Sequence, residues 1–190
     1  PIIVERAMYL DAGGQMFGAG HESAGVTAPA TRWFLAEGAT GGYFDLFLLL
    51  ANPGETPATV TATYLLPSGT TVTRSYVVGA QRRFTIWVDE EDARLADTAV
   101  STTLVSDVPI LAERAMWWPG GYATWREAHN SFGATATGTV WALGGGEVSG
   151  PPVSADTYVL VANTAATPAT VAVTVLFEDG TAAVSRTFAV

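Results

Sequence analysis

The chain has 190 residues, which is enough for one or two ordinary domains. Its 18 acidic and 9 basic residues give a net charge of −9, which argues against nucleic acid or an anionic membrane surface as a partner. The sequence contains no run of eighteen apolar residues, so it predicts no membrane-spanning segment. It also contains no cysteine, which excludes disulfide bonds and thiolate metal sites.

The first predicted element, Pro1–Tyr9, is a strand whose sequence returns at Pro109–Trp117. The offset of 108 residues persists further along the chain, because Trp33 matches Trp141. A period of this size corresponds to one small domain rather than to one turn of a solenoid. The sequence therefore predicts a tandem array of domains, of which this chain is a piece.

Seven strands are predicted between Trp33 and Trp118, at a spacing of about ten residues. They alternate apolar and polar side chains or form short apolar runs rich in Val, Leu and Thr. The predicted strands are Trp33–Glu37, Asp45–Asn52, Ala58–Leu66, Thr70–Val78, Arg83–Val88, Thr98–Ser106 and Ile110–Trp118. A single helical turn is predicted at Asp89–Asp97. This pattern is typical of an antiparallel β-sandwich of immunoglobulin-like (Ig-like) size.

The second copy of the repeat contains four predicted strands, two of them joined by a hairpin turn at Glu178–Gly180. These strands are Thr139–Leu143, Asp156–Asn163, Ala169–Phe177 and Ala182–Val190. The copy lacks the segment that corresponds to Gly79–Val108 and the strand that follows it. We therefore predict an all-β fold of tandem Ig-like antiparallel β-sandwich modules, one complete and one incomplete. The predicted divisions are the terminal strand and linker of a preceding unit (1–29), a complete sandwich (30–133) and an incomplete sandwich (134–190).

The first strand needs a partner, because a lone strand does not stay ordered in water. Three arrangements are open: neighbouring modules of a longer polypeptide complete the chain, the strand folds back within its own chain, or it is donated to the second module of another molecule. Repeated donation would build an open fibre, but it would leave two strands of the second module absent. The donor or inter-module residues are Ile2, Ile3, Val4, Met8 and Tyr9.

The motif Trp33–Gly38, followed by Phe44–Asp45 and Leu49–Pro53, resembles uncharacterised repeats of large secreted or cell-surface bacterial proteins. The segments Glu5–Tyr9 and Gly20–Ser23 are similar to the same repeats. The resemblance covers nearly the whole chain. It implies Ig-type β-sandwich modules in series, an extracellular or cell-surface location, and a stalk, adhesive or fibrous role, and it implies no catalytic residues.

An aromatic-rich segment after the last strand of the complete module is the candidate ligand-binding region. Exposed rings could stack on sugar faces, whereas buried rings would cover the joint between successive sandwiches. The candidate ligand-binding residues are Trp117, Trp118, Tyr122 and Trp125. Both interpretations remain open at this point.

The polar motifs favour structural roles. His21-Glu22-Ser23 cannot form a catalytic relay by adjacency, because neighbours in a strand point to opposite faces. We expect His21 to bond a backbone group between modules. Glu5-Arg6 recurs as Glu113-Arg114, and we expect each of these residues to pair across strands or with a loop.

The densest acidic cluster provides a weak candidate calcium site at Asp89, Glu90 and Asp92. Its spacing is not that of an EF-hand loop, and acidic residues are also favoured at the start of a helix. Otherwise we expect no metal and no cofactor.

The sequence favours a non-enzymatic extracellular structural module whose partners are neighbouring repeat modules or identical chains. The alternative is an adhesin module that binds glycan or a surface through Trp117–Trp125. A third hypothesis, an accessory domain of an enzyme, needs catalytic residues outside this sequence.

Overall fold

A computed structural model describes residues 1–152 and 154–190, apart from the side chain of Tyr122. It divides the chain into two compact units, Pro1–Gly144 (unit 1) and Gly145–Val190 (unit 2). The strands pair in antiparallel fashion, and the described helices are single 3₁₀ turns, so the predicted all-β class is confirmed. None of the described helices has the length and apolar character needed to cross a membrane.

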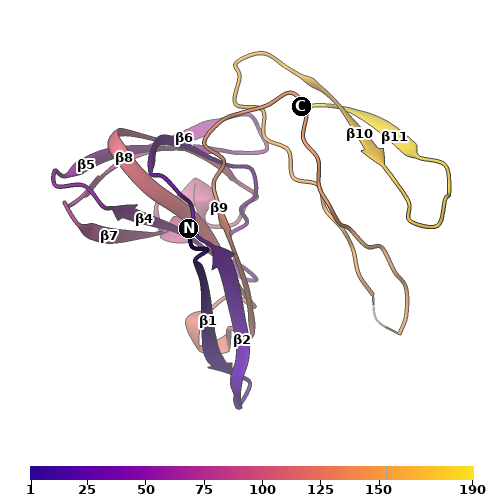
Figure 1. The fold of residues 1–190 in the computed structure, drawn as a ribbon, viewed down its shortest axis with the longest axis horizontal. Helices are drawn as coiled ribbons and strands as arrows, with labels where there is room; N and C mark the ends of the chain where they lie inside the picture. Colours follow the sequence, from indigo (N-terminus) through magenta and orange to yellow (C-terminus); the bar gives the residue numbers. More distant parts are fainter. Residues whose placement is uncertain (153) are drawn as a thin grey trace. The chain divides into compact units, whose positions relative to one another are not determined.

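Unit 1 contains strands β1 to β9 and three short 3₁₀ helices (Figure 1). The strands are β1 Glu5–Ala12, β2 Gln15–Ala24, β3 Ala30–Leu35, β4 Asp45–Asn52, β5 Ala58–Leu65, β6 Thr71–Val78, β7 Arg82–Trp87, β8 Ser101–Trp118 and β9 Glu127–Phe132. The 3₁₀ helices are η1 Val88–Glu90, η2 Ala93–Leu95 and η3 Tyr122–Thr124. The helical turn predicted at Asp89–Asp97 is thus present as two shorter turns.

Strand β8 belongs to both of the larger sheets of unit 1, which also contains the two-stranded sheet β1–β2. Its first half, Ser101–Ser106, pairs with β3 and β5, and its second half, Leu111–Trp118, pairs with β4 and β9. One sheet therefore has the order β3–β8–β5–β6, and the other has the order β9–β8–β4–β7. Pro109, which has no backbone N–H to donate to a ladder, lies between the two halves. The prediction of two separate strands at Thr98–Ser106 and Ile110–Trp118 is wrong, because these segments form one continuous strand, β8.

One apolar core lies between these two sheets, as in a β-sandwich. It is built by the period-two alternation of the strands, which turns every second side chain inward. The largest fully buried side chains include Trp33, Leu48, Tyr64 and Ile110. Burial of side chains of this size contributes roughly 1.5–3 kcal/mol each to folding.

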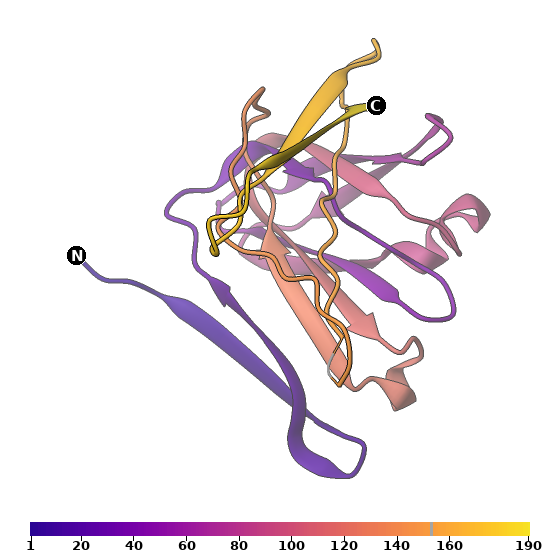
Figure 2. The same cartoon turned by 90° about the vertical axis from the view of Figure 1, so that its right-hand side faces the viewer.

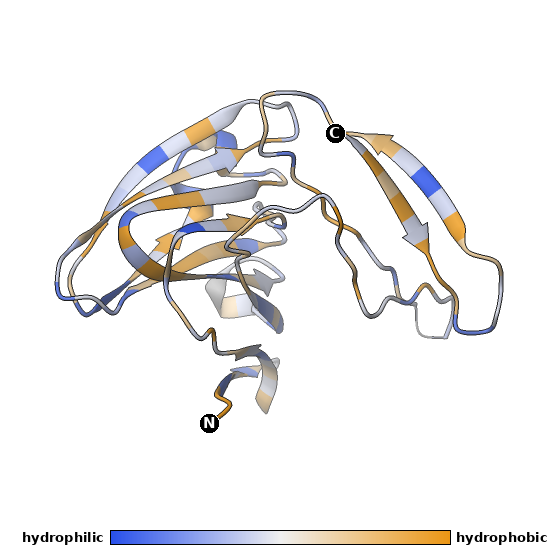
Figure 3. Cartoon of the chain, turned by 45° about the horizontal axis from the view of Figure 1, so that its top comes forward, coloured by the Kyte–Doolittle hydropathy of each residue, from blue (hydrophilic) through white to orange (hydrophobic). Residues whose placement is uncertain are grey.

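Unit 2 contains one regular hairpin, formed by β10 (Thr170–Val175) and β11 (Val184–Ala189). Figure 3 shows alternating apolar positions along it. Its register repeats that of hairpin β5–β6 in unit 1: Val171 lies opposite Phe188, and Val60 lies opposite Tyr76.

Two strands predicted for the second copy of the repeat are wrong. The segments 139–143 and 156–163 are irregular, although the matching segments of the first copy are β3 and β4. Strand β3 pairs with β8 and forms one antiparallel bridge from Phe34 to Ala134, and β4 pairs with β8 and β7. Among the described residues, no strand corresponding to β7 or β8 is assigned beside these two segments.

Candidate interaction site on the repeated hairpins

Hairpin β1–β2 and the hairpin made by β9 and the second half of β8 are copies of each other. Met8 lies opposite His21 in the first, just as Met116 lies opposite His129 in the second. Gly13 and Gly14 close the first hairpin with positive φ angles, which glycine adopts without steric cost. The repeat seen in the sequence is therefore also a repeat of strand register.

The sequence predicts the first strand of each hairpin but not the second. Strands β2 and β9 are mostly polar on one side and contain Gly or Asn, so they lack the apolar alternation that reveals a strand. The Gly13-Gly14 pair between two possible strands is the signal that could have revealed β2.

In the hairpin β8–β9, the inner face carries a buried charge. Arg114 is almost fully buried and forms an ion pair of 2.9 Å with Glu37, the residue two positions after β3. Nε2 of His129 lies 3.6 Å from the same carboxylate. Burial lowers the pKa of Arg114, opposed by the nearby charge of Glu37. Burial also lowers the pKa of His129, and the charge of Arg114 lowers it further.

In the hairpin β1–β2, the equivalent face covers a different surface. Arg6, the copy of Arg114, forms a 3.0 Å ion pair with Glu113, which lies on the outer face of β8. Asn130 of β9 donates a hydrogen bond of 2.9 Å to the same Glu113 oxygen. Leu10 packs on the small apolar cluster that contains Trp117 on this outer face. Figures 1 and 2 show β1 and β2 as a two-stranded ribbon beside β9.

Arg6 and Arg114 match the expectation that neither pairs with the adjacent glutamate. Arg6 bonds across to another strand, and Arg114 bonds the segment after β3. The two copies of one face therefore have different partners. The copy in β8–β9 lies on its own sandwich, and the copy in β1–β2 lies on the outer surface of the next hairpin.

His21 does not make the backbone hydrogen bond that we expected. Its side chain is buried, and its ring makes a T-shaped contact with Trp117, with the ring centroids 5.3 Å apart. Neither ring nitrogen has a hydrogen-bond partner among the described residues. Burial lowers its pKa first, and the charge of Arg6 adds to this effect. The neutral imidazole acts here as a packing group between the two hairpins.

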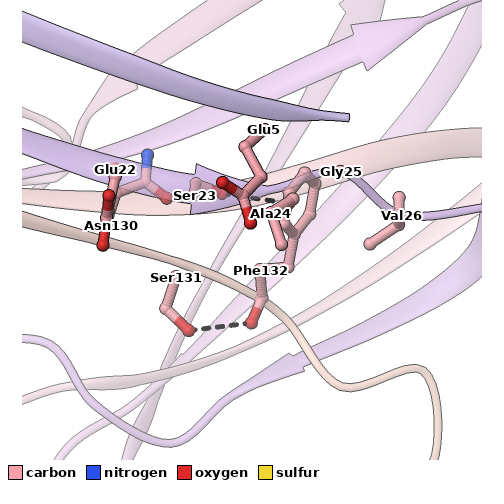
Figure 4. Close-up of a pocket in the computed structure, with 9 residues that line it drawn as sticks. All are labelled: Glu5, Glu22, Ser23, Ala24, Gly25, Val26, Asn130, Ser131 and Phe132. Carbon is pink, nitrogen blue, oxygen red and sulfur yellow. Dashed lines mark hydrogen bonds between the residues drawn. The ribbon is translucent and has the colours of Figure 1, made fainter. Parts of the chain in front are cut away.

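A pocket of about 550 Å³ lies where β1–β2 meets β9 (Figure 4). Its lining is Glu5, Glu22, Ser23, Ala24, Gly25, Val26, Asn130, Ser131 and Phe132. Ser131 bonds the carbonyl of Phe132, so its hydroxyl is not activated by a base. The lining contains the two carboxylates of Glu5 and Glu22 and no histidine.

The candidate ligand-binding aromatics are mostly internal. Trp117 is 5 % exposed and stacks on Trp125, with the ring centroids 4.9 Å apart. The indole N–H of Trp125 donates a hydrogen bond of 2.5 Å to the carboxylate of Asp45. Trp118 lies between Phe44 and His129. The side chain of Tyr122 lies outside the described residues. The rings of Trp117 and Trp118 therefore hold unit 1 together rather than presenting a flat platform.

The donor residues of the first segment remain accessible. Ile2, Ile3 and Val4 precede β1, and Met8 and Tyr9 lie within it; all five side chains are exposed. The first strand itself pairs with β2 of its own chain, which is the fold-back arrangement considered from the sequence.

The acidic cluster makes structural contacts. Asp89 accepts backbone hydrogen bonds from Gly41 and Leu46, while Asp92 forms ion pairs with Arg74 and Arg94. Burial raises the pKa of Asp89, whereas hydrogen bonds from Arg94 hold the pKa of Asp92 well below its usual range. Glu90 follows Asp89 within η1. Among the described residues, no three His, Asp or Glu side chains are placed to hold a metal ion together.

No protein-family model matches the sequence, and no curated protein matches it. The fold is similar to the crystal structure of Thermotoga maritima 1070, with a TM-score of 0.51 and 17% identity over 57% of this chain and 96% of that chain. A second solved structure, the Anabaena sensory rhodopsin transducer, gives a TM-score of 0.42 and 22% identity over 47% of this chain and 91% of that one. The first similarity concerns the fold alone.

Proposed function

We propose that this chain is a non-enzymatic structural part of an extracellular stalk or fibre built from tandem Ig-like β-sandwich modules. The extracellular location follows from the sequence resemblance, and the cysteine-free composition is compatible with it. The partners are neighbouring modules of the same kind.

The observation that carries the proposal is the exposed apolar face of the second copy. Val175 and Val159 are 48 % and 46 % exposed, whereas the residues that they match in the first copy, Tyr64 and Leu48, are 0 % and 1 % exposed. Large apolar side chains that are exposed in one copy and buried in the matching copy indicate a surface that a partner covers. In the first copy, Tyr64 and Leu48 belong to one buried cluster with side chains of β7 and β8, so a further segment of the same kind is the fitting partner.

The non-enzymatic part of the proposal is supported by the polar residues. His21 lies between two hairpins with both nitrogens unpartnered among the described residues, and Glu22 and Ser23 do not bond it. The buried Arg114 is held by Glu37 in a structural ion pair. These contacts provide stability and register rather than a nucleophile with its base.

The adhesin alternative has less support from the geometry. A sugar ring needs an accessible aromatic face, and Trp117 has its face on Trp125. Titration of the chain with a glycan panel, followed by tryptophan fluorescence, tests it: a saturable change would favour the adhesin role.

The main experiment extends the chain. Residues 79–133 are appended after Val190, which supplies the second copy with the strands that it lacks. We expect segments 139–143 and 156–163 to become strands and Trp141, now 66 % exposed, to become buried. The readouts are a blue shift of tryptophan emission and amide-exchange protection in these two segments.

The control carries Ile110→Asp in the appended copy only. Ile110 is fully buried in the first copy, so the appended aspartate should prevent docking. If the extended chain and the control show the same exposed Trp141 and the same unprotected segments, the modular proposal is wrong.

A further inference from the structure

The face of hairpin β1–β2 that carries Arg6, Met8 and His21 and its copy in β8–β9 lie on two different surfaces. Here it lies on the outer surface of β8–β9, through the Arg6–Glu113 ion pair and the contact of His21 with Trp117. Its copy, with Arg114 and Met116, lies against the core of a sandwich. One face cannot do both at once, so docking on a sandwich requires release from Glu113.

Unit 2 contains the strand sequence that such a face pairs with. In the first copy, β4 pairs along the second half of β8, with Phe47 opposite Ala115 and Leu49 opposite Glu113. The segment 156–163 matches β4, but it is unpaired and its Val159, Leu160 and Val161 are exposed. Nothing of its own unit, within the described residues, offers it a strand.

We propose that hairpin β1–β2 of one copy docks on segment 156–163 of a second copy, in the register that β8 has with β4. Transferred along the repeat, this register sets Tyr9 opposite Asp156, Ala7 opposite Tyr158, and Glu5 opposite Leu160. This inference rests on the proposed function, because it names the partner of the same incomplete module.

A carboxylate also lies near the proposed docking segment, two residues after Gly145, the position that matches Glu37. Glu147 is the only acidic residue between Leu143 and Asp156, and Glu37 is the only one between Leu35 and Asp45. Glu147 is exposed and forms no ion pair among the described residues, so it can receive Arg6 as Glu37 receives Arg114. A buried arginine without a carboxylate would be costly, and this residue removes that obstacle.

The resulting contact is heterologous. Each copy offers one hairpin and one open unit, and therefore the copies join head to tail without closing unless a ring forms. The donated hairpin corresponds to the second half of β8 and to β9, so it supplies strands for one sheet only. We therefore expect reversible, concentration-dependent association rather than a permanent fibre of this chain alone.

Disulfide trapping tests the register, because the chain has no cysteine of its own. A tagged Ala7→Cys chain is mixed with an untagged Tyr158→Cys chain and oxidised mildly. Directly opposite strand residues have the Cα spacing that a disulfide requires. Both side chains are exposed here, so neither substitution disturbs a core.

The matched control pairs Ala7→Cys with Val159→Cys, whose side chain points to the opposite face when segment 156–163 pairs as a strand. We expect severalfold more tagged–untagged dimer from the first mixture than from the control, and a further increase when Glu113→Gln releases Arg6. Equal yields in both mixtures would overturn the proposed register. The modular function would then still be judged separately by the extended chain, which carries its own covalently attached hairpin.

Discussion

Trp33 and Trp141 hold the same position in the two copies of the repeat, but they lie in opposite environments. Each donates its indole N–H to the carbonyl three residues earlier, at 3.2 Å and 3.1 Å. Trp33 is fully buried, while Trp141 is largely exposed. The local conformation is thus a property of the segment, and the burial depends on whether β8 lies beside it.

A second pair shows how far local structure persists without the sandwich. Asn52 bonds the carbonyls of Thr56 and Val78 at 2.8 Å and 3.1 Å. Asn163 bonds those of Thr167 and Val190 at the same two distances. Both networks lie within one hairpin and the loop before it. They form in both copies because they need no distant strand.

The largest expected difference between the copies comes from the two tryptophans. Trp33→Ala should destabilise the chain by about 3–5 kcal/mol, because it opens a cavity in the core of unit 1. The matched Trp141→Ala should change the free energy of unfolding by less than about 0.5 kcal/mol. Urea denaturation followed by circular dichroism measures both. Similar losses from the two variants would show that Trp141 is buried in solution.

The two asparagines should differ less. Asn52→Ala leaves buried backbone groups without partners and should cost about 2–3 kcal/mol. Asn163→Ala exposes the same groups to water and should cost under about 1 kcal/mol. Amide exchange at Gly54 and Ala165, which donate to the two side chains, reports each network separately. Faster exchange at Ala165 than at Gly54 in the unmodified chain is also expected, and the reverse order would contradict the comparison.

The two copies of the hairpin arginine provide a third contrast. Glu37→Gln removes the charge that balances the buried Arg114 and should lower the free energy of unfolding by about 1–2 kcal/mol. The loss is smaller than for a fully buried ion pair because Glu37 is partly exposed to solvent. Glu113→Gln weakens a more exposed pair with Arg6 and should cost below about 1 kcal/mol. Thermal melting of both variants tests this order, and a larger loss from Glu113→Gln would reverse it.

The smallest expected effect is the pH dependence of the contact between the two hairpins. Burial and Arg6 lower the pKa of His21, with Glu113 opposing and His129 adding to the shift. A histidine whose pKa is lower in the folded state takes up its proton more readily when unfolded, so stability should fall as the pH drops below 6.5. Amide exchange in β1 and β2 at pH 7.5 and 5.5 measures this change.

His21→Phe keeps a ring against Trp117 and removes the titration, so it should reduce the pH dependence in β1 and β2. His129 has a lowered pKa as well and remains in this variant, and therefore a residual slope from the inner face is expected. An unchanged slope in the hairpin amides would assign the effect to His129 instead.

Much of this molecule follows from its sequence. The repeat, the all-β class, the strands that find a partner within the next few residues, and the Asn52 and Asn163 networks depend on short-range pattern and turn chemistry. The hairpins β5–β6 and β10–β11 form in both copies for this reason.

Only the tertiary structure decided which of the remaining segments become strands and which faces meet. The apolar run at 156–163 has a strand sequence, but a strand needs hydrogen-bonded neighbours. The neighbours of its counterpart β4 are β7 and β8, which lie about thirty or more residues away in the chain. The pairing of Arg6 with Glu113 likewise depends on which surface the hairpin covers. Sequence pattern records the preference of each segment, whereas pairing and burial depend on long-range partners that the pattern does not contain.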